Sequence, residues 1–172
     1  MIMPPGQPLL LPAKPFFIAA SLVAGLALNM LPLGREVWMP DFLMLLLAFW
    51  CVHQPQRVGM GVAFVLGLCM DVHATSLLGQ HALAYAVLAY GAAALQRRLA
   101  WFSAWAQALH VLPLLLLAHA IELALGLAGG GAFPGVAVVV APLLETLLWP
   151  LASWVLLAPQ RRPPESDENR PL

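Results

Sequence analysis

The chain has 172 residues, of which 62% are hydrophobic and only 9% are charged, and its mean hydropathy is +0.85. About a quarter of the residues in a soluble domain carry charge, so this composition predicts an integral membrane protein and excludes a substantial soluble domain. The eight basic and eight acidic side chains cancel, which gives no electrostatic reason to expect a nucleic acid as partner. Cys51 and Cys69 fall inside apolar runs and are predicted to be small buried hydrophobes.

The expected fold is all-α, a polytopic membrane protein with about six transmembrane helices. Residues 1–14 are predicted to be an irregular lead-in, residues 15–158 the six-helix transmembrane domain, and residues 159–172 a disordered cytoplasmic tail. The tail combines proline with charged residues and has little apolar surface to bury, a composition typical of disorder.

Six apolar segments are predicted to form the helices: residues 16–33, 38–52, 57–72, 78–95, 102–127 and 134–157. The second is shorter than the roughly 20 residues that span a bilayer without tilt. Pro113 predicts a kink in the fifth helix, while Pro142 and Pro150 predict a bend or break in the sixth, because proline removes a backbone donor.

Basic residues predict the orientation, since cytoplasmic loops carry an excess of lysine and arginine. With six spans and cytoplasmic termini, only Arg35 lies outside, and the cytoplasmic set is Lys14, Arg57, Arg97, Arg98, Arg161, Arg162 and Arg170. A second interpretation is contact with a cytoplasmic partner, which has less support than a role as topology signals. It applies to Arg57, Arg97, Arg98, Arg161 and Arg162. Trp38 is predicted at the outer membrane interface, and Trp149 is predicted to pack inside the bundle. The cytoplasmic interface is predicted to hold Trp50, Trp101, Trp105 and Trp154.

Residues 57–91 are predicted to be a hairpin of two apolar helices with a stripe of small residues. Gly59, Ala63, Gly67 and Asp71 recur at spacings of four, which places them along one helix face. In a membrane such a stripe allows two helices to approach closely. The spacing leaves open whether the second helix belongs to this chain or to a partner.

Two acidic residues are predicted near the outer face. Asp41 starts the second helix, where a carboxylate is favoured as a cap, and docking of a partner is the alternative. Asp71 ends the third helix, where it either anchors the turn at Thr75 and Ser76 or contacts a partner, because an acid inside a membrane span needs a partner.

His119 and Glu122 are three residues apart on the fifth helix, so they share a face and are predicted to form an intramembrane polar pair. A pair that holds helices together is favoured over a proton relay or a metal site. Glu145 is predicted nearer the middle of the membrane on the sixth helix. The sequence contains no metal-binding, nucleotide-binding or hydrolase motif, and no catalytic residue, metal or cofactor is expected.

The sequence resembles the MreD family, integral-membrane rod shape-determining proteins of bacteria. The residues that carry the resemblance are Met39-Pro40-Asp41, Trp50, Pro55, Arg57-Val58-Gly59, Gly67-Leu68, Asp71, Leu78-Gly79-Gln80-His81-Ala82-Leu83-Ala84-Tyr85, Trp105-Ala106-Gln107-Ala108 and Leu148-Trp149-Pro150. They cover most of residues 38–155, and the central block is the most specific.

The resemblance implies a non-enzymatic component of the cell-elongation complex in the bacterial inner membrane. Its partners would be the scaffold MreC and, through the complex, the MreB filament, the RodA glycosyltransferase and a class B penicillin-binding protein, together with membrane lipid. It also implies a fold similar to the six-helix substrate-binding subunits of vitamin transporters, which does not carry the transport function over. Asp41, Asp71, Gly59, Ala63 and Gly67 are the candidate partner contacts.

A second functional hypothesis comes from the residues alone. A small-molecule-binding subunit of a membrane transporter would use a polar cavity around His119, Glu122 and Glu145. An intramembrane hydrolase has less support, because no nucleophile and base or metal set accompanies these groups. Monomer and homodimer both stay open.

Overall fold

The computed structural model describes residues 13–31 and 38–160. These form six α-helices, and no strand occurs in either described range, which confirms the all-α prediction. The helices are α1 (Pro15–Met30), α2 (Phe42–His53), α3 (Met60–Ala74), α4 (Gln80–Leu99), α5 (Ala104–Ala128) and α6 (Val140–Leu157), with short 3-10 helices η1 (Val136–Val139) and η2 (Ala158–Gln160). Nearly all of the predicted lead-in (1–14) and tail (159–172) lies outside the described residues.

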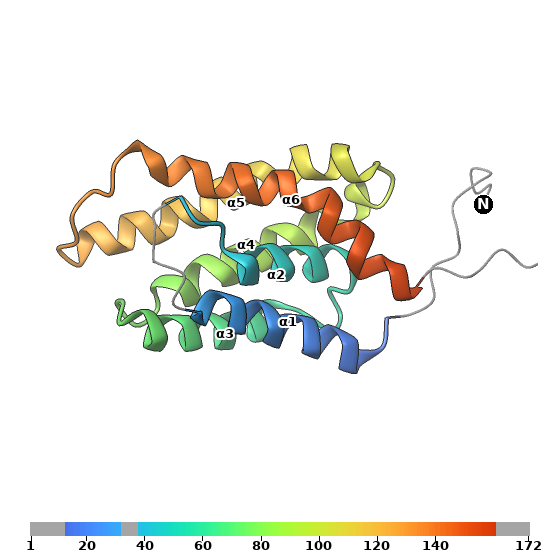
Figure 1. Ribbon diagram of the computed structural model, residues 1–172, viewed down its shortest axis with the longest axis horizontal. Helices are drawn as coiled ribbons and strands as arrows, with labels where there is room; N and C mark the ends of the chain where they lie inside the picture. The colour runs from blue at the N-terminus through green and yellow to red at the C-terminus, as the bar shows by residue number, and fades with distance from the viewer. Residues whose placement is uncertain (1–12, 32–37, 161–172) are drawn as a thin grey trace, which may run out of the picture.

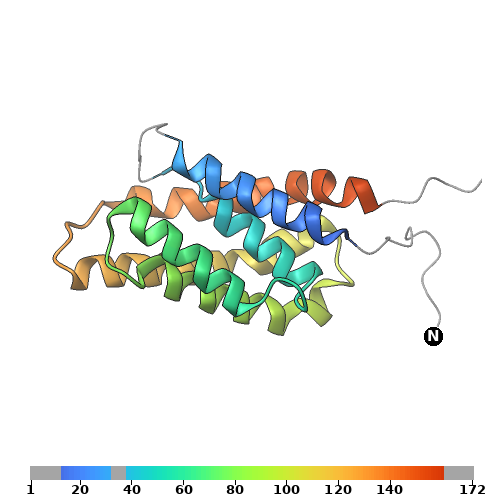
Figure 2. The same ribbon diagram turned by 90° about the horizontal axis from the view of Figure 1, so that it is seen from below.

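The six helices lie side by side along the long axis of the bundle and alternate in direction (Figure 1). The start of α1 and the end of α6 lie at one end, and the turn between α3 and α4 lies at the other, as the second view also shows (Figure 2). The α5–η1 connection is at the same end as the α3–α4 turn.

Helix α2 is the centre of the bundle and packs against α1, α4, α5 and α6. Its sequence is apolar on every side, which suits a helix surrounded by others, and nearly all of its side chains from Leu43 to Val52 are buried. At 1.5 Å per residue its 12 residues are about 18 Å long. That is shorter than the roughly 30 Å hydrocarbon core of a bilayer. The backbone N–H and C=O groups at the two ends of α2 therefore need partners from neighbouring helices.

Among the described residues, two segments are long and apolar enough to cross a membrane, Ala104–Ala128 and Val136–Gln160. Helix α5 continues through Pro113, which faces outward. The sixth segment starts as η1, and Pro142 lies in the first turn of α6, where a missing donor costs little. The axis of α6 turns in its C-terminal half, where Pro150 lies inside the helix (Figure 1), as the predicted bend requires.

The outer surface of the bundle is largely apolar. Large hydrophobic side chains point outward from most of the helices, among them Val23, Val65, Leu109, Leu147 and Leu151. Soluble proteins seldom expose apolar surface this continuously, whereas a bilayer covers it without cost. The helices are thus consistent with a membrane protein.

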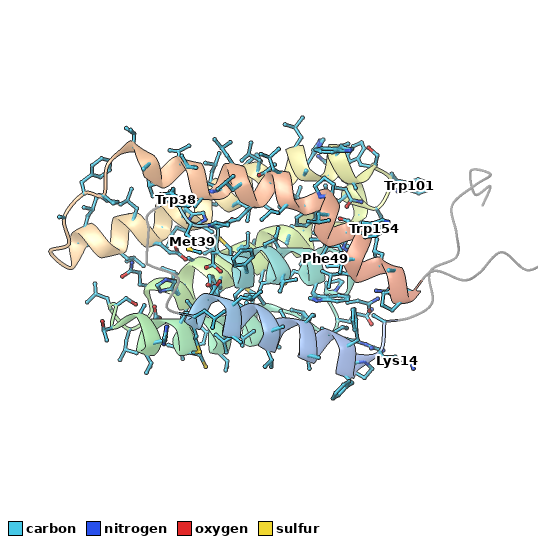
Figure 3. The ribbon with its side chains drawn as sticks, viewed as in Figure 1. Lys14, Trp38, Met39, Phe49, Trp101 and Trp154 are labelled. Atoms are coloured by element: carbon cyan, nitrogen blue, oxygen red, sulfur yellow. The ribbon has the colours of Figure 1, made fainter. Side chains whose placement is uncertain are left out.

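The tryptophans lie partly as predicted. Exposed Trp101 and Trp154 lie at the same end of the bundle as Lys14, and Trp38 lies in the opposite half (Figure 3). Trp149 is fully buried, as predicted for packing. The placement of Trp50 in a lipid-facing belt is wrong, because it is fully buried and donates its Nε1 hydrogen to Ser21 Oγ at 2.8 Å.

The two cysteines also differ from each other. Cys51 is buried, as predicted, and its thiol donates to the carbonyl of Val58. Cys69 is exposed on α3, so its predicted burial within the chain is wrong. An apolar run alone does not distinguish a core face from a face turned toward lipid, because both are apolar.

Candidate functional site

Asp71 anchors the turn that joins α3 to α4. Its carboxylate is 1% exposed and accepts hydrogen bonds from the amides of Gly79 (2.8 Å) and His81 (2.7 Å). His81 Nδ1 lies 2.8 Å away and Ser76 Oγ 3.1 Å away. Gly79 has a φ of +101°, a backbone conformation that glycine adopts without strain. An acid that accepts amide hydrogens at the start of a helix acts as an N-terminal cap.

The small-residue stripe packs against α4 within the chain. Ala63 is fully buried, and a Cβ added to Gly67 would lie 2.6 Å from the amide nitrogen of Ala82. Gly67 thus allows α3 and α4 to approach at backbone distance. Gly59 is the exception, since its added Cβ would meet only the carbonyl oxygen of Pro55, at 3.7 Å. The structure thus brings Ala63, Gly67 and Asp71 together at the interface between α3 and α4.

Asp41 caps α2 and bonds to two further helices. Its Oδ1 accepts from the amide of Met44 at 2.8 Å and from the side-chain amide of Asn29, on α1, at 2.5 Å. Its Oδ2 accepts from the hydroxyl of Tyr85, on α4. Asn29 in return accepts from the amide of Phe42 at 3.1 Å. The capping role proposed from the sequence is therefore present, and it forms part of a larger network.

Glu145 continues this network into α5 and α6. It is fully buried, and its Oε1 accepts from the amide of Asp41 at 2.8 Å and lies 2.9 Å from His119 Nε2. His119 Nδ1 lies 3.6 Å from Glu122 Oε2. The predicted contact between His119 and Glu122 thus exists, and the shorter contact of His119 is with Glu145.

Together these side chains make a buried polar cluster that joins α1, α2, α4, α5 and α6. We call it the polar cluster, and its members are Asn29, Asp41, Tyr85, His119, Glu122 and Glu145. Sequence reasoning missed Asn29 and Tyr85. The one available signal was that each is a hydrogen-bonding side chain inside an apolar helix, where such groups seek partners.

An open pocket of about 230 Å³ borders the polar cluster at the bundle end where α4 begins and α5 ends. Its polar lining is Gln80, His119 and Glu122, and Gln80 Nε2 donates to the backbone oxygen of Glu122 at 3.0 Å. The rest of the lining is Leu123, Gly126, Leu127, Gly131, Ala132, Pro134 and Val138. A cavity with apolar walls and a few polar groups on one side is the usual form of a small-molecule site.

The described arginines lie at helix ends. Arg57 precedes α3 and donates to the carbonyl of Ala13 at 2.5 Å. Arg97 and Arg98 are exposed in the last turn of α4, where positive charge is favoured. The predicted contacts of Arg161 and Arg162 fall outside the described residues.

The chemistry available to the polar cluster is hydrogen bonding and charge stabilisation. Within residues 13–31 and 38–160, no group of three or more histidine, cysteine, aspartate or glutamate side chains has a geometry suited to a metal ion. The cluster connects helices that are distant in sequence, since Asp41 and Glu145 are separated by 104 positions.

Comparison with known proteins identifies the family. The sequence model described as rod shape-determining protein MreD matches residues 12–159. A rod shape-determining protein MreD of Haemophilus influenzae is 31% identical over 130 residues, which cover 73% of this chain and 76% of that protein. No solved structure matches the chain, so the expected likeness to vitamin transporter subunits is not supported. The chain belongs to the MreD family of rod shape-determining proteins.

Proposed function

We propose that this chain is a non-enzymatic component of the cell-elongation complex in the bacterial inner membrane. It docks partner membrane proteins and so coordinates lateral peptidoglycan synthesis with cell shape. Its direct partner is MreC, and MreB, RodA and a class B penicillin-binding protein join through the complex. The chain crosses the membrane six times with both termini in the cytoplasm. The match to the rod shape-determining family over residues 12–159 is the observation that carries this proposal.

The use of the polar groups inside the chain supports a scaffold role. Asp41, Asp71 and Glu145 accept hydrogen bonds from groups of other helices or from the turn that follows. With the bond from Asn29 to Asp41, they involve all six helices. A bundle stabilised in this way presents fixed apolar faces to its neighbours in the membrane, which suits docking.

The outward face of α3 is the docking surface that the structure favours. Helix α3 packs mainly against α4 and, to a smaller extent, α1, so it lies at the edge of the bundle. Val62, Phe64 and Val65 are exposed, and a Cβ added to Gly61 would meet no atom within 4 Å. Glycine on a lipid-facing helix surface allows a second transmembrane helix to approach closely. We assign that second helix to MreC.

Replacement of Gly61 by leucine tests the docking surface. The leucine has open space in this chain, so the protein should fold normally, while the close approach of a partner helix is blocked. We expect Gly61→Leu to reduce the recovery of MreC in co-purification and to make cells round when the variant replaces the native copy. Ala120→Leu, on the exposed face of α5, is the matched control and should preserve both.

Thermal unfolding of both purified variants separates docking from folding. Normal recovery of MreC and rod-shaped cells with Gly61→Leu would exclude α3 as the docking surface. Rod-shaped cells after deletion of the whole coding sequence would refute the proposed function itself.

A further inference from the structure

The turn between α4 and α5 presents an exposed group of basic and aromatic side chains. Arg97 and Arg98 are exposed in the last turn of α4. Trp101 follows in the connecting turn and is 71% exposed, and Trp105, in the first turn of α5, is 68% exposed. Phe102 lies between the two tryptophans in the chain and is also exposed. We call these five residues the α4–α5 surface.

Hydrogen bonds from a buried side chain hold this turn in one shape. Gln107 Nε2 donates to the carbonyl oxygens of Leu99 and Phe102, at 3.0 and 3.1 Å. Gln107 is buried, and its Oε1 accepts from the indole of Trp149 at 3.4 Å. The ring of Phe102 stacks on that of His110, with ring centres 4.7 Å apart. The exposed side chains therefore start from a fixed backbone, which lowers the entropy cost of binding a ligand.

The positive charge of the α4–α5 surface has no acidic partner among the described residues. All ion pairs formed within residues 13–31 and 38–160 use histidine as the basic group. The carboxylates of these ranges are used elsewhere, three in the polar cluster and Asp71 in the α3–α4 turn. Residues 72–121 contain no acidic residue. Arg97 and Arg98 thus carry charge that no described carboxylate neutralises.

The position of the α4–α5 surface is that of a membrane interface. Trp101 lies at the same end of the bundle as Lys14, beyond the apolar middle of the helices (Figure 3). Tryptophan gathers where the hydrocarbon core of a bilayer meets the head groups, and the guanidinium of arginine binds phosphate with two parallel hydrogen bonds. The surface therefore matches a phospholipid, with the phosphate at the arginines and the glycerol against the aromatic rings.

Charge selects among the phospholipids. Phosphatidylcholine and phosphatidylethanolamine carry an ammonium beside the phosphate, and on this surface that ammonium would lie next to two guanidinium groups without a described carboxylate to accept it. Like charges placed side by side lower affinity. An anionic phospholipid such as phosphatidylglycerol brings the phosphate without the ammonium.

We propose that the α4–α5 surface binds an anionic phospholipid of the surrounding bilayer. Arg97 and Arg98 hold its phosphodiester, and Trp101 and Trp105 pack against its glycerol backbone and first methylene groups. The recognised group is a phosphodiester without a neighbouring ammonium. This inference does not depend on the proposed docking function, because it concerns the purified chain and lipid alone.

Titration of the purified full-length protein with phosphatidylglycerol in dodecyl maltoside tests the proposal. The thermal midpoint is measured against lipid concentration, with phosphatidylcholine of the same acyl chains as the neutral lipid and inorganic phosphate as the soluble anion. We expect a saturable rise of the midpoint with phosphatidylglycerol only. The absence of this rise would overturn the proposal, as would an equal rise with phosphatidylcholine or with inorganic phosphate at the same concentration.

Two pairs of arginine variants locate the site. The double variant Arg97→Gln with Arg98→Gln should weaken the apparent affinity for phosphatidylglycerol about 30-fold, since each basic residue near an anionic lipid contributes about fivefold. Both arginines are exposed, so the fold should be kept. Arg161→Gln with Arg162→Gln is the matched control, because it removes another adjacent pair of charges, and its loss should be much smaller. Equal losses in the two pairs would refute a site at the α4–α5 surface.

Quenching of tryptophan fluorescence gives a readout that charge alone does not change. Phosphatidylglycerol brominated near the glycerol end of its acyl chains quenches an indole that it contacts. At low ratios of lipid to protein, Trp101→Phe with Trp105→Phe should remove most of the quenching. Trp38→Phe, in the opposite half of the bundle (Figure 3), should retain it. Equal quenching in both variants would contradict the placement of the lipid on these rings.

Discussion

Removal of the Asp71 carboxylate should destabilise the protein more than most single changes. In Asp71→Ala, the amides of Gly79 and His81 and the ring of His81 lose an acceptor at 2.7–2.8 Å. Polar contacts between membrane helices average about 0.6 kcal/mol each, and hydrogen bonds to charged groups about 1.5 kcal/mol or more. Three such bonds therefore predict a loss of about 2–4 kcal/mol in the free energy of unfolding.

Reversible unfolding in mixed micelles, titrated with sodium dodecyl sulfate and followed by far-ultraviolet circular dichroism, measures this loss. Ser76→Ala is the control, since it removes only longer contacts of the hydroxyl, at 3.1 Å to Asp71 Oδ1 and at 3.4 Å to the Asp71 backbone oxygen and to His81 Nδ1. It should cost less than about 1 kcal/mol. A change below about 0.5 kcal/mol in Asp71→Ala would refute the assignment of Asp71 as the turn anchor.

Two further changes test the interior of the bundle. Gly67→Ala should destabilise the protein by about 1–3 kcal/mol, because its Cβ would lie 2.6 Å from the Ala82 amide nitrogen. The control Gly61→Ala should change stability little, because the added Cβ has no atom within 4 Å. Equal unfolding curves for the two variants would contradict this. Tyr85→Phe should cost about 1–2 kcal/mol by leaving Asp41 Oδ2 without its donor, and a thermal midpoint equal to that of the parent would exclude that hydrogen bond as a stabilising contact.

Local patterns in the sequence predict the helices and their caps well. The six apolar segments correspond to α1 through α6, because runs of apolar residues separated by proline, glycine and charge define helix limits from neighbouring residues alone. The cap at Asp41 is local, because its carboxylate accepts from the amide of Met44, three residues later. The anchor at Asp71 similarly serves a turn that follows directly in the chain.

Contacts between distant helices could not be predicted in the same way. Each helix is apolar on most sides, so hydrophobic periodicity does not show which way Tyr85 or Asn29 points. The preference of His119 for Glu145 over Glu122 depends on the position of α6 relative to α5, which no spacing encodes. The four-residue spacing correctly predicts a shared face for Ala63, Gly67 and Asp71, whereas Gly59 precedes α3 and does not reach that face. Only the fold reveals that α4 covers the face.

The polar cluster has a consequence for the order of biosynthesis. The chain is made from its N-terminus, and the acceptor shared by the Asp41 amide and His119 is Glu145, on the last helix. Until α6 is inserted, both donors lack this acceptor inside the bilayer, where an unpaired polar group is costly. An incomplete chain thus differs from a finished one by the unpaired Asp41 amide and His119 ring inside the bundle. Membrane proteases that recognise such unpaired polar groups would degrade truncated copies before they join a complex.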